Sequence, residues 1–129
     1  PAFNVATSVS LIIAQRLARR LCSHCAEPAD IPKEILLKEG FTEEDLSEAT
    51  LMKPVGCSKC SNGSKGRVGI YEVVRITDNI SRIIMDGGNS IEIADAANKE
   101  GFDNLRRSAL RKAAQGLISL EEVNRVTKD

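Results

Sequence analysis

Apolar residues recur at helical spacing near the start of the chain. Between Val5 and Leu21 they fall three or four positions apart, and glutamine and arginine fill the intervening positions. The apolar positions are Val9, Ile12, Ile13, Leu17 and Leu21. This pattern predicts one amphipathic helix that runs directly into Cys22.

The middle of the chain predicts short helices with clear start signals. Pro32 suits a first helical turn, so a helix is expected over residues 31–38, closed by Gly40. Thr42 begins a second helix, because Asp45 three positions later completes a weak capping box.

An extended stretch and a turn follow. Residues 50–55 are expected to be extended, and residues 61–66 carry the glycine, asparagine and serine typical of turns. Residues 67–76 are rich in β-branched side chains and contain a tyrosine, which predicts a strand or hairpin arm.

The residues that follow this strand are predicted to form helices. Asp78 is expected to cap a segment that ends at Gly87-Gly88, and Ser90 to start a helix over residues 91–99 that stops at Gly101.

Two more helices are predicted before the end of the sequence. One carries Leu105 and Ala109 and stops at Gly116, and Ser119 with Glu122 forms a capping box for the last. The last third is therefore expected to be an all-helical bundle.

The predicted fold class is mainly α with a small β-hairpin. A tetracysteine zinc-binding element is expected between an N-terminal helix and a C-terminal helical bundle. The corresponding segments are residues 1–21, 22–76 and 77–129.

Composition narrows the possible functions. Eighteen basic residues balance eighteen acidic ones, so net charge gives no reason to expect nucleic acid as a partner. Only 3% of the residues are aromatic, which leaves little bulky material for a core. The longest apolar run, residues 9–14, is far shorter than the roughly 20 residues of a membrane span. Without an initiator Met or a signal peptide, the chain is expected to be an excised piece with cytosolic thiols.

All four cysteines fall in two Cys-x-x-Cys pairs, Cys22 with Cys25 and Cys57 with Cys60, and residues 26–56 lie between the pairs. Each pair places two thiolates on one tight turn, and two such turns supply the tetrahedron of a structural zinc site. We therefore predict that these four residues bind one structural zinc.

Other uses of the cysteines remain open at this point. Iron accepts the same four thiolates, and the pairs also fit disulfides or a redox dithiol. His24 lies inside the first pair and is read as an exposed turn residue, because four cysteines already saturate the metal.

No catalytic residue is predicted. One histidine cannot supply a Ser-His-Asp set, and four protein ligands leave no open position for metal catalysis. The Gly-x-x-Gly of residues 63–66 is not a phosphate-binding Gly-x-x-x-x-Gly-Lys loop, and no small-molecule substrate is expected.

Three stretches resemble the secretion ATPases of type II secretion and type IV pilus assembly. They are Phe3–Cys25, with its Ala-Gln-Arg-Leu-Ala-Arg-Arg-Leu-Cys run, Gly56–Glu72, with Cys-x-x-Cys and Gly-Arg-x-Gly-Ile-Tyr-Glu, and Gly116–Val126. The resemblance covers essentially the whole chain. It departs at Ser64, where members commonly carry Tyr. The residues of the predicted N-terminal helix and of the segment 73–77 favour pilus extension over type II secretion.

The resemblance implies a hexameric, Mg-ATP-using motor at the cytoplasmic face of the bacterial inner membrane. It would act on an integral-membrane platform protein, with possible regulatory proteins as further partners, to insert pilin. The Walker loops would precede Pro1, so residues 1–129 alone are not expected to hydrolyse ATP, and residues 1–21 would be a helical tail of the RecA-like core. Alternatives are a type II secretion ATPase, a zinc-ribbon nucleic-acid module and a dithiol redox protein.

Overall fold

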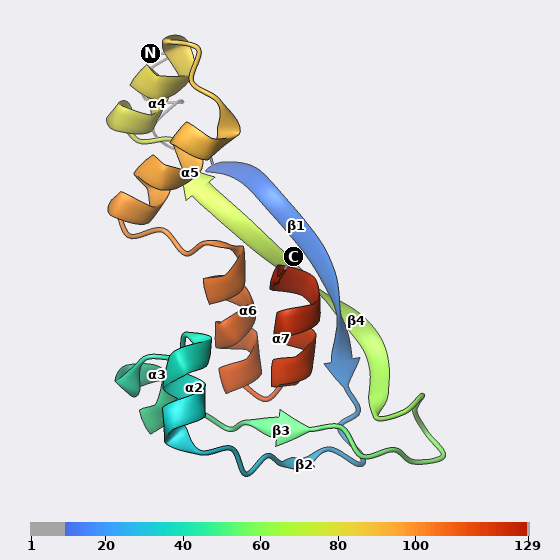
Figure 1. Ribbon diagram of the computed structural model, residues 1–129. Coiled ribbons are helices and arrows are strands. Elements are labelled where there is room, and N and C mark those ends of the chain that lie inside the picture. The colour runs from blue at the N-terminus through green and yellow to red at the C-terminus, as the bar shows by residue number, and fades with distance from the viewer. Residues whose placement is uncertain (1–9, 129) are drawn as a thin grey trace. The chain divides into compact units, whose positions relative to one another are not determined.

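The computed structural model describes residues 10–128, which form six helices and two two-stranded sheets (Figure 1). The elements in chain order are β1 (Ser10–Leu21), β2 (Glu27–Pro28), α2 (Lys33–Glu39), α3 (Glu43–Ser47), β3 (Met52–Lys53), β4 (Ser64–Arg75), α4 (Asp78–Met85), α5 (Ser90–Lys99), α6 (Leu105–Ala114) and α7 (Leu120–Thr127). The predicted class, mainly α with a small amount of β structure, is confirmed at this coarse level.

The predicted N-terminal helix is wrong where the structure describes it. Residues 10–21 form strand β1, which pairs with β4, while residues 5–9 of the predicted helix lie outside the described residues. Short apolar runs fit helix and strand almost equally well by spacing alone. Ile12 and Ile13 are β-branched, and pairing with a strand more than 40 residues away decided the outcome.

Contacts divide the chain into two units. Among the described residues, the first contains 10–15 and 71–105, and the second contains 16–70 and 106–128. Helices α4 and α5 belong to the first unit, whereas α7 and all of α6 except Leu105 belong to the second. The helices of the last third form as predicted, and their assembly into one helical bundle stays a prediction.

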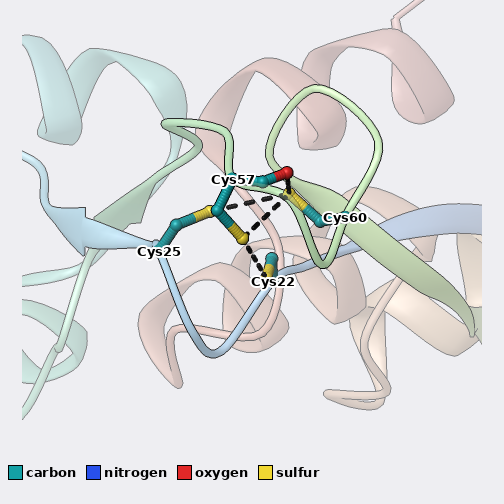
Figure 2. A group of neighbouring side chains, drawn as sticks. All are labelled: Cys22, Cys25, Cys57 and Cys60. Atoms are coloured by element: carbon teal, nitrogen blue, oxygen red, sulfur yellow. Dashed lines mark hydrogen bonds between the residues drawn. The ribbon is translucent and has the colours of Figure 1, made fainter.

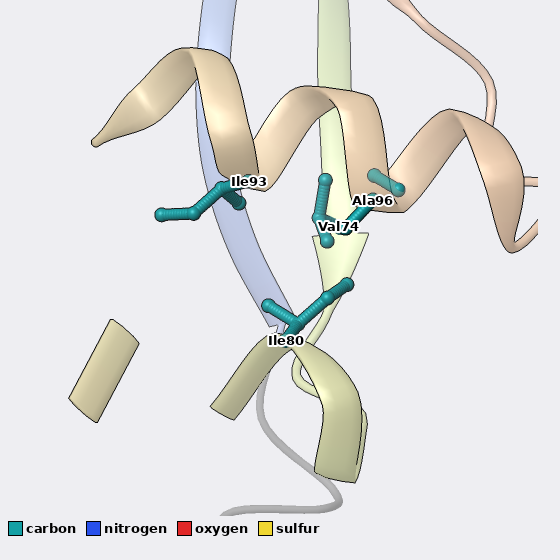
Figure 3. Close-up of a cluster of buried hydrophobic side chains, with 5 residues drawn as sticks. Val74, Ile80, Ile93 and Ala96 are labelled. Carbon is teal, nitrogen blue, oxygen red and sulfur yellow. The ribbon is translucent and has the colours of Figure 1, made fainter. Parts of the chain in front are cut away.

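The first unit has a small aliphatic core. Val74 of β4, Ile80 of α4 and Ile93 of α5 point toward one another in Figure 3, together with Ala96. Val74 and Ile80 are completely buried. Partly buried side chains surround this cluster, namely Ile13, Ile76, Ile83 and Phe102. Aliphatic packing therefore replaces the missing aromatics.

The second unit joins segments that are distant in sequence. Its buried side chains come from both chain segments and include Leu36, Phe41, Ile70, Leu110, Ile118 and Val123. β2 and β3 pair antiparallel, with Glu27 opposite Lys53. The backbone N–H of Thr50 donates to Ala114 O at 2.8 Å, so the segment between the cysteine pairs is tied to α6.

Helix starts follow the predicted capping chemistry only in part, and at α5 Asn89, rather than Ser90, is the N-cap and accepts from the Glu92 N–H. Thr42 and Asp45 form the full capping box of α3. Thr77, rather than Asp78, caps α4. At α7, Ser119 Oγ accepts from the Glu122 N–H, but the Glu122 carboxylate bonds elsewhere, so only half of that box forms. Within residues 10–128, no helix combines the length and apolar character needed to cross a bilayer.

Candidate metal centre

The four cysteines lie in two loops of the second unit, one between β1 and β2 and one between β3 and β4. Cys22 directly follows β1, Cys25 precedes β2, and Cys57 and Cys60 lie between β3 and β4. Figure 2 shows their side chains converging from two loops. All four sulfurs lie within 4.8 Å of one another, and among the described residues no other such group of histidine, cysteine and carboxylate side chains occurs.

The sulfur spacing fits a tetrahedral metal site. Cys22 Sγ lies 3.8 Å from Cys57 Sγ, and Cys60 Sγ lies 3.7 Å from both Cys25 Sγ and Cys57 Sγ. A zinc–sulfur bond of about 2.3 Å gives a tetrahedron whose edges are about 3.8 Å. A disulfide requires about 2.05 Å, and all four cysteines are free. The donor set therefore fits one four-thiolate metal ion.

Each cysteine pair is held by its own turn. Ala26 N–H donates to Cys22 O at 3.0 Å, and Cys60 N–H donates to Cys57 O at 3.4 Å. Gly56 N–H donates to Cys25 Sγ at 3.3 Å. The backbone next to the second pair thus contacts a sulfur of the first pair.

A two-residue turn after Cys60 brings the pairs together. Ser61 and Ser64 exchange backbone hydrogen bonds across Asn62 and Gly63, whose φ angles of 54° and 91° are typical of the Asn-Gly hairpin turn. Gly63 O accepts from the N–H of Cys22 at 2.9 Å. The turn thus connects the second cysteine pair to the first.

Gly63 is required at this position. A Cβ atom there would lie 2.5 Å from Pro54 Cβ, and the positive φ is also unfavourable for a side chain. The sequence predicted a turn, and the structure shows that its glycine positions Cys22.

The thiols differ in exposure and acidity. Cys22 is completely buried and Cys57 is exposed. Burial raises the pKa of the Cys22 thiol, but hydrogen bonds from the His24 N–H and neighbouring groups outweigh it and lower the pKa to about 7. The Lys59 N–H lowers the pKa of Cys57, but burial and bonds with the other thiols raise it to about 11.

His24 lies in the turn between Cys22 and Cys25 and is exposed. It is not a member of the four-cysteine group. Its predicted position as an exposed turn residue is confirmed.

Two arginines of α6 anchor the segment between the cysteine pairs, a feature the sequence prediction missed. Arg107 donates to both carboxylate oxygens of Asp45, at 2.7 Å for Oδ1. Arg106 donates to Glu39 O and to Glu39 Oε2, at 2.6 and 2.7 Å, and to the side chains of α7.

These ion pairs change the acidity of their partners. Hydrogen bonds from Arg107 are the largest cause that lowers the pKa of Asp45 to about 2, against the opposing effect of burial. Burial raises the pKa of Glu39, but Lys128 and Arg106 outweigh it, so that this pKa is lowered. Both carboxylates are therefore ionised at neutral pH.

Comparison with known proteins places the chain in a family. The family model described as "Type II/IV secretion system protein" matches residues 1–125. The chain is 65% identical, over its whole length, to the type IV pilus assembly ATPase PilB of Pseudomonas aeruginosa, and covers 23% of that protein. It is 59% identical, over 98% of its length, to PilB of Acinetobacter baylyi and covers 22% of it.

A more distant relative comes from the secretion branch. The chain is 36% identical, over 98% of its length, to type II secretion system protein E of Pectobacterium carotovorum, and covers 25% of that protein. It thus spans about a quarter or less of the length of these relatives. The match over residues 1–125 shows that the chain belongs to the type II/IV secretion system protein family, as a member of the PilB-type secretion ATPases.

Proposed function

We propose that this chain is a metal-stabilised region of a hexameric ATPase motor that powers type IV pilus assembly. The observation that carries the proposal is the difference in sequence identity to the two kinds of relative. The chain is 65% identical to a pilus assembly ATPase but 36% identical to a type II secretion protein, over nearly the same residues. A role in type II secretion is the alternative, at lower identity.

Cys22, Cys25, Cys57 and Cys60 would hold the metal as four thiolates. The metal is zinc in this proposal, and iron is the competitor, because both accept four sulfurs. Zinc would supply a crosslink and no reaction, since its binding free energy becomes folding free energy, on the order of 10 kcal/mol in small metallodomains. The sulfur spacing of 3.7–3.8 Å supports this assignment.

The chemistry of the motor lies outside these residues in this proposal. Mg-ATP would bind elsewhere in the full-length protein, which would work at the cytoplasmic face of the inner membrane on a membrane platform protein. Residues 10–128 would give the hexamer a structural docking element. The ties between α6 and the segment between the cysteine pairs support a structural role.

Metal content tests the site directly. Elemental mass spectrometry of chain purified without added metal is expected to find one zinc per molecule, and a strong chelator is expected to lower the melting temperature. A Cys57→Ser variant should lose the metal, whereas Ser58→Ala, in the same turn, should keep it. If the purified chain holds iron instead of zinc, the zinc assignment is wrong. It is also wrong if the chain holds no metal and a chelator leaves its melting temperature unchanged.

A segment exchange tests the motor assignment. The corresponding segment of Pseudomonas aeruginosa PilB would be replaced by this chain, and the chimera expressed in a strain that lacks that protein. Surface pili are expected to return. The same exchange into type II secretion system protein E is expected to leave secretion defective. Restored secretion without restored pili would favour the alternative.

A further inference from the structure

A polar hollow of about 400 Å³ lies in the second unit, beside the turn that follows Cys60. Its lining residues are Arg19, Ser61, Asn62, Ser64, Gly66 and Arg67. No carboxylate lines it. We infer that this hollow binds a phosphate group.

The two arginines reach the hollow from paired strands, Arg19 from β1 and Arg67 from β4. Both residues are exposed. Among residues 10–128, no ion pair or hydrogen bond engages the guanidinium of Arg67. A planar guanidinium offers several N–H donors in the geometry that phosphate oxygens accept.

Glu122 is a carboxylate that contacts Arg19. Its carboxylate accepts from Arg125 Nε and Nη2 at 2.7 and 2.9 Å, and from the backbone N–H of Arg19 at 2.7 Å. The Arg19 guanidinium lies at 4.0 Å from Glu122, at the limit of an ion pair. The carboxylate is therefore largely satisfied by other donors, and Arg19 remains available to an anion.

The remaining lining groups suit a phosphate rather than a cation or an apolar ligand. Ser61, Asn62 and Ser64 bring hydroxyl and amide donors, and the Asn-Gly turn fixes the backbone that carries them. Lys65 adds a further positive charge next to this set in sequence. Phosphate carries both the negative charge and the acceptor oxygens that this set of donors requires.

The test is titration of the chain with pyrophosphate at low salt, followed by isothermal calorimetry and by backbone amide NMR shifts. Saturable shifts are expected at residues 61–67. Arg67→Gln should weaken the affinity roughly tenfold or more, since a charge-assisted bidentate contact is lost. Arg75→Gln removes one charge from the same strand outside the hollow, and should change the affinity by less than about twofold.

The same titration is repeated with inorganic phosphate and with ATP. Similar site-specific shifts with all three ligands would identify the phosphate group as the recognised chemistry, whereas saturation by ATP alone would indicate a nucleotide site. Equal weakening by Arg67→Gln and Arg75→Gln, or shifts spread over all basic residues, would overturn the inference. Far-ultraviolet circular dichroism verifies that each variant is folded.

Discussion

The ion pair between Arg107 and Asp45 provides the sharpest test of how the segment between the cysteine pairs is held. Arg107→Gln removes the charge and leaves a shorter, neutral side chain that ends in an amide. It is expected to destabilise the chain at pH 7, because Asp45 is left half-buried without its main partner.

The size of the effect follows from the acidity of Asp45. A pKa lowered to about 2 from the usual value near 3.8 corresponds to about 2 kcal/mol in favour of the ionised carboxylate. Thr42 supplies part of this stabilisation, and solvent reaches Arg107, whose side chain is 22% exposed. The share due to Arg107 is therefore about 1 kcal/mol.

The coupling free energy between Arg107 and Asp45 can be measured in a double-mutant cycle. Each variant is unfolded with urea and followed by circular dichroism, with metal content held constant. The cycle combines Arg107→Gln with Asp45→Asn, and Lys112→Gln serves as a charge-matched control on α6. The expected coupling free energy is about 1 kcal/mol. A coupling below about 0.3 kcal/mol, or an equal loss in the control, would refute the reasoning.

The pair also predicts a pH dependence with a defined sign. The folded-state pKa of Asp45 is lowered, so its contribution is fully present above the unfolded pKa near 3.8 and is lost as the pH falls toward about 2. The stability difference between the parent and Arg107→Gln should therefore shrink from about pH 5 downward. Because both proteins carry the same cysteines, the effect of acid on the thiolates cancels in this difference.

Other sites give shorter tests by thermal or urea unfolding. Gly63→Ala should lower both stability and metal affinity, because its Cβ has no room, whereas Gly66→Ala, with open space around it, should cost only about 1 kcal/mol for its positive φ. Val74→Ala should destabilise the first unit by about 2 kcal/mol through loss of buried methyl groups. Arg106→Met should leave the last carbonyl of α2, Glu39 O, without its donor and cost about 1–3 kcal/mol. Unchanged stability of Val74→Ala or Arg106→Met, or equal losses for the two glycine variants, would contradict these assignments.

Local chemistry explains which elements the sequence predicted well. The box of Thr42 and Asp45 and the glycine stop at Gly40 depend on neighbours within a few residues, and both occur in the structure. The Cys-x-x-Cys pairs likewise carry their turns in their own spacing, so the four-cysteine group was predictable. Its closure still needed the Asn-Gly turn, which the sequence indicated only as a turn.

Contacts between distant residues explain what was missed. β1 was predicted as a helix because the spacing of Ile12, Ile13 and Leu17 fits a helix. That spacing carries no information about the partner strand β4, which lies more than 40 residues away. The contacts of Arg106 and Arg107 were not predicted, since their partners Glu39 and Asp45 are more than 60 residues distant. The charge of an arginine is visible in the sequence, but the residues that it contacts in the fold are not.

The segment between the cysteine pairs is thus held in two ways that are physically separate. The thiolates close its ends, and arginines of α6 hold Glu39 and Asp45 in its interior, where Leu36 and Phe41 are buried. Removal of the metal should therefore open the cysteine turns before α2 and α3 leave α6.

Amide hydrogen exchange with and without chelator measures this order. Exchange at residues 22–26 and 56–63 is expected to rise first and furthest, while α2 and α3 keep protection until the chain unfolds globally. In Arg107→Gln the protection of α3 should fall while metal is still bound. A uniform rise from residue 22 to residue 70 on chelation would mean that the metal alone organises the segment, and that the arginine contacts add nothing independent.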